Sequence, residues 1–573
     1  MTADKKNNND YDVLIVGASP ASLVLALQLS RYNVKFQIID KRSGFSENSP
    51  SFTLKPSTLD ALATLNLADS LMTQGTSVRK INAYIKGKPA FDIDFRPKNA
   101  TSYAVMLSLE QKKIETVLAA TLQAQNHSIL WNTELVNFQS SRDGVHVDIV
   151  QEGKKIKAST AWMVGCDGYD SFVREKLGIP FVGSTDVEKF LSADVDIQWG
   201  LHKTEGYVFM HPSDLFAAIP LSDGKYRVIT MLDGSDKDSK ADVAKLVEKF
   251  QKLVPVKGIL TAPTRLETIK CHRRCATKLR SGRVFLLADA AHEQSALGDH
   301  DLNSGIHDAV NLGWKLGCFI RGWVQESYLD SYESERLKVA QSLQQNTHAA
   351  MKVILARSYL GQFIRDVIAP LILSYPAAEN QLKRILADSK ASYGDSPITY
   401  WGRDYGTGIA TRIKEGFLSG VFAGDGAPSF DLMIPKDFKR VKLAKLKTSE
   451  NYLLLFMQGE KSKDFHKLYQ EFQNVKKRLN GFAECYYIIG EHAVDYTNLD
   501  KNLEDVYIDP DGRGHQIYRC FDPTILIIRP DNYVCYRGDT HLNSLEPFLL
   551  QYFNPEAFAH KADETKASVN IAV

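Results

Sequence analysis

YDVLIVGASPASLVLALQLSRYNVKFQIID, residues 11–40, is the stretch that decides the fold. Residues 11–16 form a short apolar run, which predicts a buried strand, and small residues headed by Gly17 follow directly. Apolar residues then recur at helical spacing over residues 23–31, and a second apolar run ends at Asp40. The pattern predicts a strand, a tight turn, a helix and a parallel strand, the first unit of a doubly wound α/β sheet.

The turn after the first strand stands where a GxGxxG fingerprint would bind a dinucleotide. In that fingerprint one glycine makes the turn, the second lets the pyrophosphate approach the backbone, and the third permits close helix packing. Only Gly17 is kept here, and Ser19 and Ser22 occupy the other two positions. Asp40 ends the second strand, where a carboxylate can accept from ribose hydroxyls. Taken alone, these residues also fit a βαβ crossover that binds nothing.

Length and composition limit the class of protein. A chain of 573 residues is too long for one hydrophobic core, so we expect two or three domains. The net charge of +2 offers no field that would attract nucleic acid or an anionic membrane. No apolar stretch approaches the ~18 residues that span a bilayer, and residues 1–10 lack the apolar core of a signal peptide. We expect a cytoplasmic protein that binds neither nucleic acid nor a membrane.

The seven cysteines are scattered and show neither CxxC nor His/Cys ligand spacing. Buried, reduced thiols are the expected explanation, and no metal site is predicted.

The rest of the chain divides into segments of different pattern. Period-two and apolar strands ending in VGCDG extend the first unit, and antiparallel strands then suggest a sheet set over a ligand pocket. The apolar run at residues 283–289, RVFLLAD, predicts a further strand of the first sheet, and helices follow it. Alternating runs near the end of the chain predict a separate α/β domain. The expected divisions are a disordered N-terminus at 1–9, a nucleotide-binding domain with its following helices at 10–185 and 265–400, a sheet domain at 186–264 with part of 75–108, a C-terminal domain at 405–558, and a tail at 559–573.

Two long motifs give the chain a family resemblance. Residues 161–181, AWMVGCDGYDSFVREKLGIPF, resemble the DG motif of the class A flavoprotein monooxygenases, the p-hydroxybenzoate hydroxylase and phenol hydroxylase superfamily. Residues 283–317, RVFLLADAAHEQSALGDHDLNSGIHDAVNLGWKLG, look like the GD motif of that family with its flavin-edge loop and helix. AGDGAPSFDL and IIRPDNYVCYRGD resemble the thioredoxin-like C-terminal domain of the phenol hydroxylase branch. The resemblance implies a Rossmann-like FAD-binding domain, an interleaved antiparallel-sheet substrate domain, a helical segment and a thioredoxin-like domain.

The resemblance also implies which residues bind the cofactor. Asp289 would accept from the ribityl hydroxyls of FAD, Asp167 would hold the cofactor or the approaching nicotinamide from the other side, and Gln111 would contact the flavin. A solvated turn aspartate is the alternative for both carboxylates. The complete set of expected FAD-binding residues is Gly17, Ser19, Pro20, Ala21, Ser22, Asp40, Lys41, Arg42, Gln111, Asp167, Asp289, Gly298, Leu302 and Asn303.

The sequence departs from the family pattern around the flavin. Ser295 replaces a proline, residues 298–301 read GDHD in place of a GGQG-like stretch, and Ala288 replaces the glycine of the GD motif. The family's arginine and activating acidic residue are both missing around residues 49–52, so no catalytic base is predicted.

The two aspartates of the GDHD stretch should affect how easily the flavin is reduced. Asp299 and Asp301 would oppose the negative charge of reduced flavin, so reduction should be harder unless His300 is protonated or the side chains turn outward.

Three functions remain open. The leading hypothesis is an FAD- and NAD(P)H-dependent monooxygenase that hydroxylates a phenolic or polyketide-like aromatic substrate through a C4a-hydroperoxyflavin. The rival is a monooxygenase-like protein with a degenerate flavin site, acting as a non-catalytic binding or assembly component. The third is a flavin enzyme with other redox chemistry. Since the C-terminal domain lacks a CxxC pair, we expect it to pack or to form a homodimer rather than to exchange disulfides.

Overall fold

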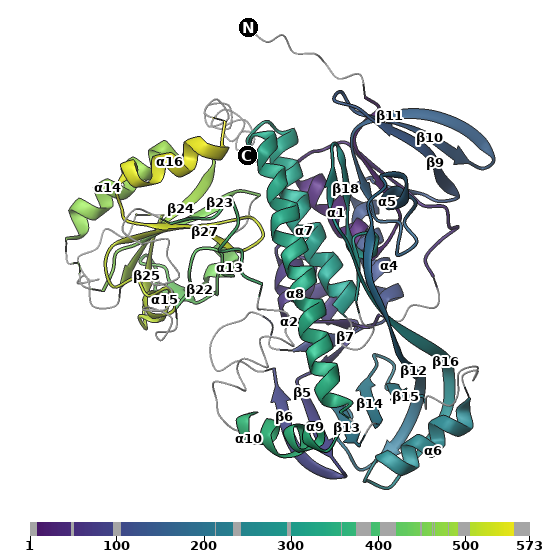
Figure 1. Ribbon diagram of the computed structural model, residues 1–573. Coiled ribbons are helices and arrows are strands. Elements are labelled where there is room, and N and C mark those ends of the chain that lie inside the picture. Colours follow the sequence, from purple (N-terminus) through teal and green to yellow (C-terminus); the bar gives the residue numbers. More distant parts are fainter. Residues whose placement is uncertain are drawn as a thin grey trace.

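The computed structural model describes residues 9–46, 51–95, 103, 105–212, 214–232, 242–294, 300–356, 358–373, 391–401, 420–446, 450–460, 462, 464–479, 481–490, 503 and 505–554. Within these ranges the chain forms three eight-stranded sheets and one three-stranded sheet. Two long helices, α7 (His300–Ile320) and α8 (Asp330–Ile354), lie between the C-terminal sheet and the other sheets (Figure 1). The predicted N-terminal and C-terminal tails fall largely outside the described residues.

The first sheet is built around the parallel strands that the sequence predicted. Its order is β17-β18-β11-β1-β2-β8, and the antiparallel meander of β9 and β10 adds to β11. β1 is buried from Val13 to Val16 because the sheet is covered on both faces. Helix α1 (Pro20–Arg31) connects β1 to β2. The strands are β1 (Tyr11–Val16), β2 (Phe36–Ile39), β8 (Ile129–Leu130), β9 (Thr133–Ser140), β10 (Val145–Gln151), β11 (Lys154–Gly165), β17 (Arg280–Ser281) and β18 (Val284–Leu286).

Helix α7 packs closely on α1. A methyl group added at Gly313 would lie 2.6 Å from the Cβ of Gln28, and one added at Gly317 would lie 2.5 Å from the Cγ of Tyr32. The two glycines therefore let the backbones of α7 and α1 approach each other.

The second sheet is mostly antiparallel, in the order β19-β16-β12-β15-β14-β13-β5-β6. Helix α6 (Val243–Leu253) covers one face, where Leu246 and Phe250 are buried and Trp199 packs against the ring of Phe250. Strands β12 and β16 run beyond the bounds expected for a sheet domain and join this sheet to the first. The strands are β5 (Lys80–Ile85), β6 (Lys88–Asp94), β12 (Phe181–Trp199), β13 (Gly206–His211), β14 (Asp214–Pro220), β15 (Tyr226–Met231), β16 (Gly258–Ala276) and β19 (His292–Glu293).

Short elements connect these sheets. A small sheet has the order β3-β7-β4, with β3 at Thr53–Leu54, β7 at Met106–Ser108 and β4 at Thr76–Val78. The shorter helices are α2 (Pro56–Ala63), α3 (Ala68–Met72), α4 (Gln111–Ala124), α5 (Phe172–Lys176), α9 (Tyr359–Phe363) and α10 (Ala369–Leu373). None of the helices within the described ranges is long and apolar enough to cross a bilayer.

The third sheet has the order β20-β27-β26-β23-β24-β25-β21-β22. Parallel β23 and β24 are joined through helix α14 (Phe465–Arg478), and β26, β27 and helix α16 (Leu542–Tyr552) follow. Whether this unit is thioredoxin-like stays a prediction. Its strands are β20 (Tyr400–Trp401), β21 (Asp431–Met433), β22 (Arg440–Lys442), β23 (Tyr452–Met457), β24 (Ala483–Gly490), β25 (Val506–Asp509), β26 (Thr524–Ile528) and β27 (Val534–Gly538).

The cysteines agree with the prediction of buried thiols, because all seven are buried and none forms a disulfide.

Candidate active site

The turn after β1 keeps the shape of a dinucleotide turn. Gly17 has φ +103°, and a Cβ there would overlap the carbonyl oxygen of Cys166 at the end of β11, so only glycine fits. Ser19 takes over the start of α1, since its Oγ accepts a hydrogen bond from the Ser22 amide at 3.3 Å. Pro20 follows at the first helical position. The helix N-terminus that favours a phosphate is therefore retained without the other two glycines.

The carboxylate of Asp40 is already occupied by four N–H groups. Its oxygens accept from the Ala18 amide at 2.7 Å, the Arg42 amide at 2.8 Å, and the Nε and Nη2 of Arg42 at 3.0 and 2.8 Å. Burial raises the pKa of Asp40, but these bonds outweigh burial and lower it overall. A ribose hydroxyl can reach this carboxylate only if the Arg42 side chain, which is 40% exposed, moves aside. The neighbouring Lys41 is exposed.

Gln111 begins α4 and contacts a buried carboxyl that the sequence did not single out. Its Nε2 donates to Glu115 Oε1 at 2.8 Å. Burial raises the pKa of Glu115 to about 7, and the Gln111 bond and the charge of Arg42 offset this only in part. The i, i+4 spacing from Gln111 is the one sequence signal that could have indicated Glu115.

Asp167 holds the DG turn together. Its carboxylate accepts from Ser171 Oγ at 2.6 Å and from the Val173 amide at 3.0 Å, at the start of α5. Burial raises its pKa despite these bonds. The structure thus gives Asp167 a capping role within the turn, and its contact with the cofactor or nicotinamide stays a prediction.

Asp289 follows β18 in a short 3-10 turn, Ala288–Ala290. Among the described residues, none donates a hydrogen bond to its carboxylate. Burial and the charge of Asp308 raise its pKa, while His292 lowers it. An acceptor without a donor is what ribityl hydroxyls would satisfy. Ala288 has φ +55°, a conformation that suits glycine, so alanine in place of the family's glycine strains the backbone here.

The residues after the GD turn carry buried polar atoms that lack partners. Within the described part of the chain, His292 Nδ1, Glu293 Oε2 and both side-chain amide atoms of Gln294 make no hydrogen bond. Unpaired buried polar groups are rare in folded proteins. All three residues follow Asp289 within five positions of the chain, which fits a polar ligand such as FAD.

At the start of α7 a buried lysine lies beside His300 of the GDHD stretch. Lys55, which precedes α2, lies with its Nζ 2.6 Å from His300 Nδ1, and both side chains are buried. Asp301 Oδ1 accepts from the Gln294 amide at 2.7 Å, which fixes its orientation. The expected excess of negative charge is therefore offset at these residues by Lys55, which sequence reasoning missed.

Two further expected residues, Leu302 and Asn303, lie in the first turn of α7. Asn303 accepts from the Lys55 amide at 2.9 Å and donates to the Thr53 carbonyl at 2.9 Å. Leu302 is buried. Gly298, with Ser295 and Asp299, lies outside the described residues.

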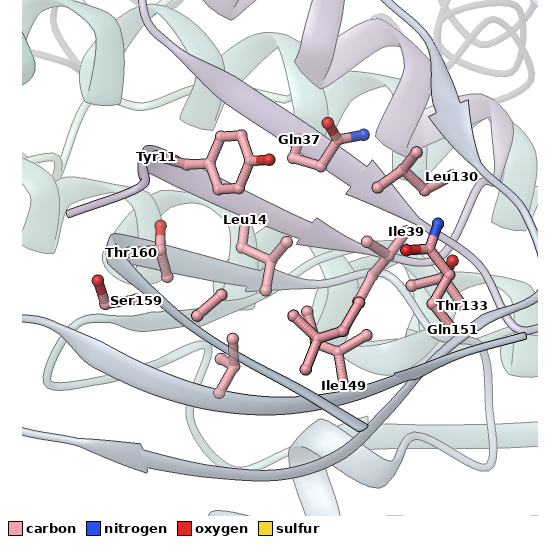
Figure 2. A pocket seen from close by; sticks show the side chains of 13 residues that line it. Tyr11, Leu14, Gln37, Ile39, Leu130, Thr133, Ile149, Gln151, Ser159 and Thr160 are labelled. Carbon is pink, nitrogen blue, oxygen red and sulfur yellow. The ribbon is translucent and has the colours of Figure 1, made fainter. Parts of the chain in front are cut away.

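A separate hollow of about 140 Å³ lies between the first sheet and its meander (Figure 2). Leu14, Ile39 and Ile149 line it, together with the polar side chains of Gln37 and Thr160. None of the expected cofactor residues lines it, so it is distinct from the candidate flavin site.

A sequence profile described as "FAD binding domain" matches residues 10–347. The chain belongs to this family. It is a flavin-dependent monooxygenase, and its cofactor is FAD. It is 31% identical over 409 residues to 6-methylpretetramide 4-monooxygenase of Streptomyces rimosus, with 69% of this chain and 72% of the relative covered. It is 26% identical over 560 residues to pentachlorophenol 4-monooxygenase of Sphingobium chlorophenolicum, with 95% and 97% covered.

Solved structures share the fold of this monooxygenase. The flavin-dependent monooxygenase PieE, in complex with FAD and substrate, has a TM-score of 0.74 at 18% identity, covering 96% of this chain and 99% of that one. Aklavinone-11 hydroxylase, in complex with FAD and aklavinone, has a TM-score of 0.70 at 21% identity, covering 95% and 98%. The predicted superfamily and α/β fold class are confirmed. The non-catalytic alternative finds no support.

Proposed function

We propose that this monooxygenase hydroxylates a phenolic or polyketide-like aromatic substrate, with NADH or NADPH as the reductant. The proposal rests on the Asp289 carboxylate and on the buried polar atoms of Gln294, five residues further along, which have no partner among the described residues, in a chain of the FAD binding domain family. Relatives named pentachlorophenol and para-nitrophenol 4-monooxygenase act on phenols, and aklavinone-11 hydroxylase was solved with FAD and aklavinone.

Different residues of the described part of the chain would bind different parts of FAD. The N-terminus of α1 at Ser19 would face the pyrophosphate, Asp289 would accept from the ribityl chain, and the first turn of α7 would approach the flavin. FAD, when bound, supplies the redox and oxygen-activating chemistry, and the protein supplies position and water exclusion. Lys55, paired with His300, would stabilise negative charge on the cofactor.

The second sheet is the proposed substrate side. Phe190 and Met231 are buried there, and Met351 and Ile354 of α8 pack against the same apolar cluster, which would exclude water. One polar group on this side is Arg227, which pairs with Asp194 and whose guanidinium lies 4.6 Å from the centre of the Phe52 ring.

Location and assembly are proposals too. Seven buried cysteines without a disulfide favour a reducing compartment such as the cytoplasm. Dimerisation through the C-terminal unit is testable by size-exclusion chromatography with light scattering.

The deciding experiment is spectroscopic. The purified protein should be yellow or should quench the fluorescence of added FAD, and candidate phenols or polycyclic phenols should stimulate its oxidation of NADPH or NADH. Tight flavin binding without stimulation by any aromatic compound would refute hydroxylation, while product analysis would separate hydroxylation from uncoupled oxidation.

A further inference from the structure

A buried network of charged side chains joins the GD turn to the C-terminal sheet. Asp308 and Lys315 lie on α7, Glu335 and Arg336 lie on α8, and Arg529 follows β26. Each of these residues is no more than 2% exposed. Figure 1 shows α7 and α8 between the two parts that the network connects.

At one end, Asp308 fixes the GD turn. Its Oδ2 accepts from His292 Nε2 at 2.7 Å and from the Ala288 amide at 3.3 Å. Its Oδ1 accepts from Arg336 Nε at 2.5 Å. Burial favours the neutral acid, but Arg336 and His292 outweigh it and hold the pKa of Asp308 at about 2. One ionised carboxylate thus holds the amide of Ala288, next to the proposed ribityl ligand.

At the other end, Glu335 receives the guanidinium of the C-terminal unit. Its two oxygens accept from the Nη1 and Nη2 of Arg529 at 2.7 and 3.0 Å. Lys315 Nζ and Ser396 Oγ donate to the same carboxylate at 2.8 and 2.6 Å. Arg529 also binds Asp531, with its Nε 2.9 Å from Oδ1.

Helix α8 and Tyr393 connect the Asp308 end of the network to the Glu335 end. Glu335 and Arg336 are adjacent on α8, and Arg336 Nη1 donates to the Tyr393 hydroxyl at 3.0 Å. The guanidinium of Arg529 lies 5.1 Å from the centre of the same Tyr393 ring. A shift of Glu335 must therefore act on Arg336, and through it on Asp308.

The charges of the network balance only with Arg529 present. Its carboxylates are Asp308, Glu335 and Asp531, and its cations are Lys315, Arg336 and Arg529. Without Arg529 three buried carboxylates share two cations, Lys315 and Arg336, and Arg336 is the cation that holds Asp308. We propose that Arg529 is a positioning residue for the GD turn, so that the C-terminal unit orders the FAD site from a distance.

The test uses full-length Arg529→Met. In the apoprotein, hydrogen exchange of the Ala288 amide should accelerate about tenfold, and the Kd for FAD from fluorescence quenching should rise at least fivefold. The double variant Arg529→Met with Glu335→Gln restores the charge balance and should recover most of the protection. The control is Tyr452→Phe, which removes only the 2.6 Å hydroxyl bond to Tyr328 from the same interface. It should leave exchange at Ala288 and the Kd unchanged.

Unchanged exchange in Arg529→Met would overturn the proposal, and so would an equal acceleration in Tyr452→Phe. If Arg529→Met does not fold, Arg529→Lys replaces it in the test. Lysine keeps the charge but cannot donate to both oxygens of Glu335 at once, so exchange of the Ala288 amide should accelerate, though less than in Arg529→Met. No acceleration in Arg529→Lys would contradict the proposal. Because exchange is measured without FAD, a failure of cofactor binding is distinguishable from a failure of this coupling.

Discussion

Ala288 holds a backbone conformation that favours glycine, at φ +55°. In the folded state, the left-handed conformation costs an alanine roughly 1–2 kcal/mol. A glycine avoids this cost, but its more flexible unfolded chain lowers the free energy of unfolding by about 0.4–1 kcal/mol. Ala288→Gly should therefore stabilise the apoprotein by up to about 1 kcal/mol in urea unfolding. Ala290→Gly, in the same turn but without positive φ, should destabilise it by about 1 kcal/mol. Equal losses in the two variants would contradict the strain at Ala288.

Glu115 should make stability depend on pH. Its pKa rises from 4.5 in the unfolded chain to about 7 in the fold, because it is buried. Below pH 4.5 Glu115 is protonated in both the folded and the unfolded state. Between pH 4.5 and 7 only the unfolded state releases the proton, so the free energy of unfolding falls by up to about 3 kcal/mol as the pH rises. Glu115→Gln should be more stable than the wild type at pH 8, with the difference vanishing near pH 4.5, as urea unfolding would show.

Glu110 provides the control for this dependence. Burial raises its pKa, but its own amide, Ser222 and Lys113 outweigh burial and lower it overall, so its ionised form stabilises the fold above its ordinary pKa. Glu110→Gln should therefore lose stability at pH 8, opposite in sign to Glu115→Gln. The same sign in both variants would refute the assignment.

At the scale of elements, the contact of α7 with α1 depends on two glycines. A methyl group at Gly313 would lie 2.6 Å from the Cβ of Gln28, so the helices must separate. Gly313→Ala should destabilise the protein by about 1–3 kcal/mol, measured by urea unfolding, despite the better helix propensity of alanine. Gly200→Ala, where a Cβ meets nothing within 4 Å, should change stability by less than about 0.5 kcal/mol. A loss below 0.5 kcal/mol in Gly313→Ala would mean that α7 is loosely packed.

Elements built from neighbouring residues were predictable, and pairings between distant residues were not. The unit of β1, α1 and β2 follows from apolar runs and a turn within thirty residues, because local periodicity decides it. The Lys55–His300 pair joins residues 245 apart, and the Arg529–Glu335 pair joins residues 194 apart. No pattern along the chain marks either pair, so neither pairing could be predicted from the sequence.

Over the whole molecule, the C-terminal sheet and the FAD-binding sheet share one hydrophobic core. Trp314 of α7 packs edge-on against Tyr452 of β23, and Tyr328 contacts Phe553 beyond α16. When either of two such parts unfolds, the aromatic side chains that it shares with the other become exposed to water, and the free energy gained by burying them is lost. The two sheets should therefore melt together rather than as independent domains.

Calorimetry tests this coupling. The apoprotein should show one unfolding transition, and FAD at 100 times its Kd should raise the stability of that whole transition by about 2.7 kcal/mol. For a chain of 573 residues this corresponds to a rise in Tm of roughly 2 °C. Far-UV circular dichroism should follow the same curve as the fluorescence of the buried tryptophans. Two transitions, of which FAD moves only one, would show instead that the C-terminal unit unfolds independently, and that the shared aromatic core contributes little to its stability.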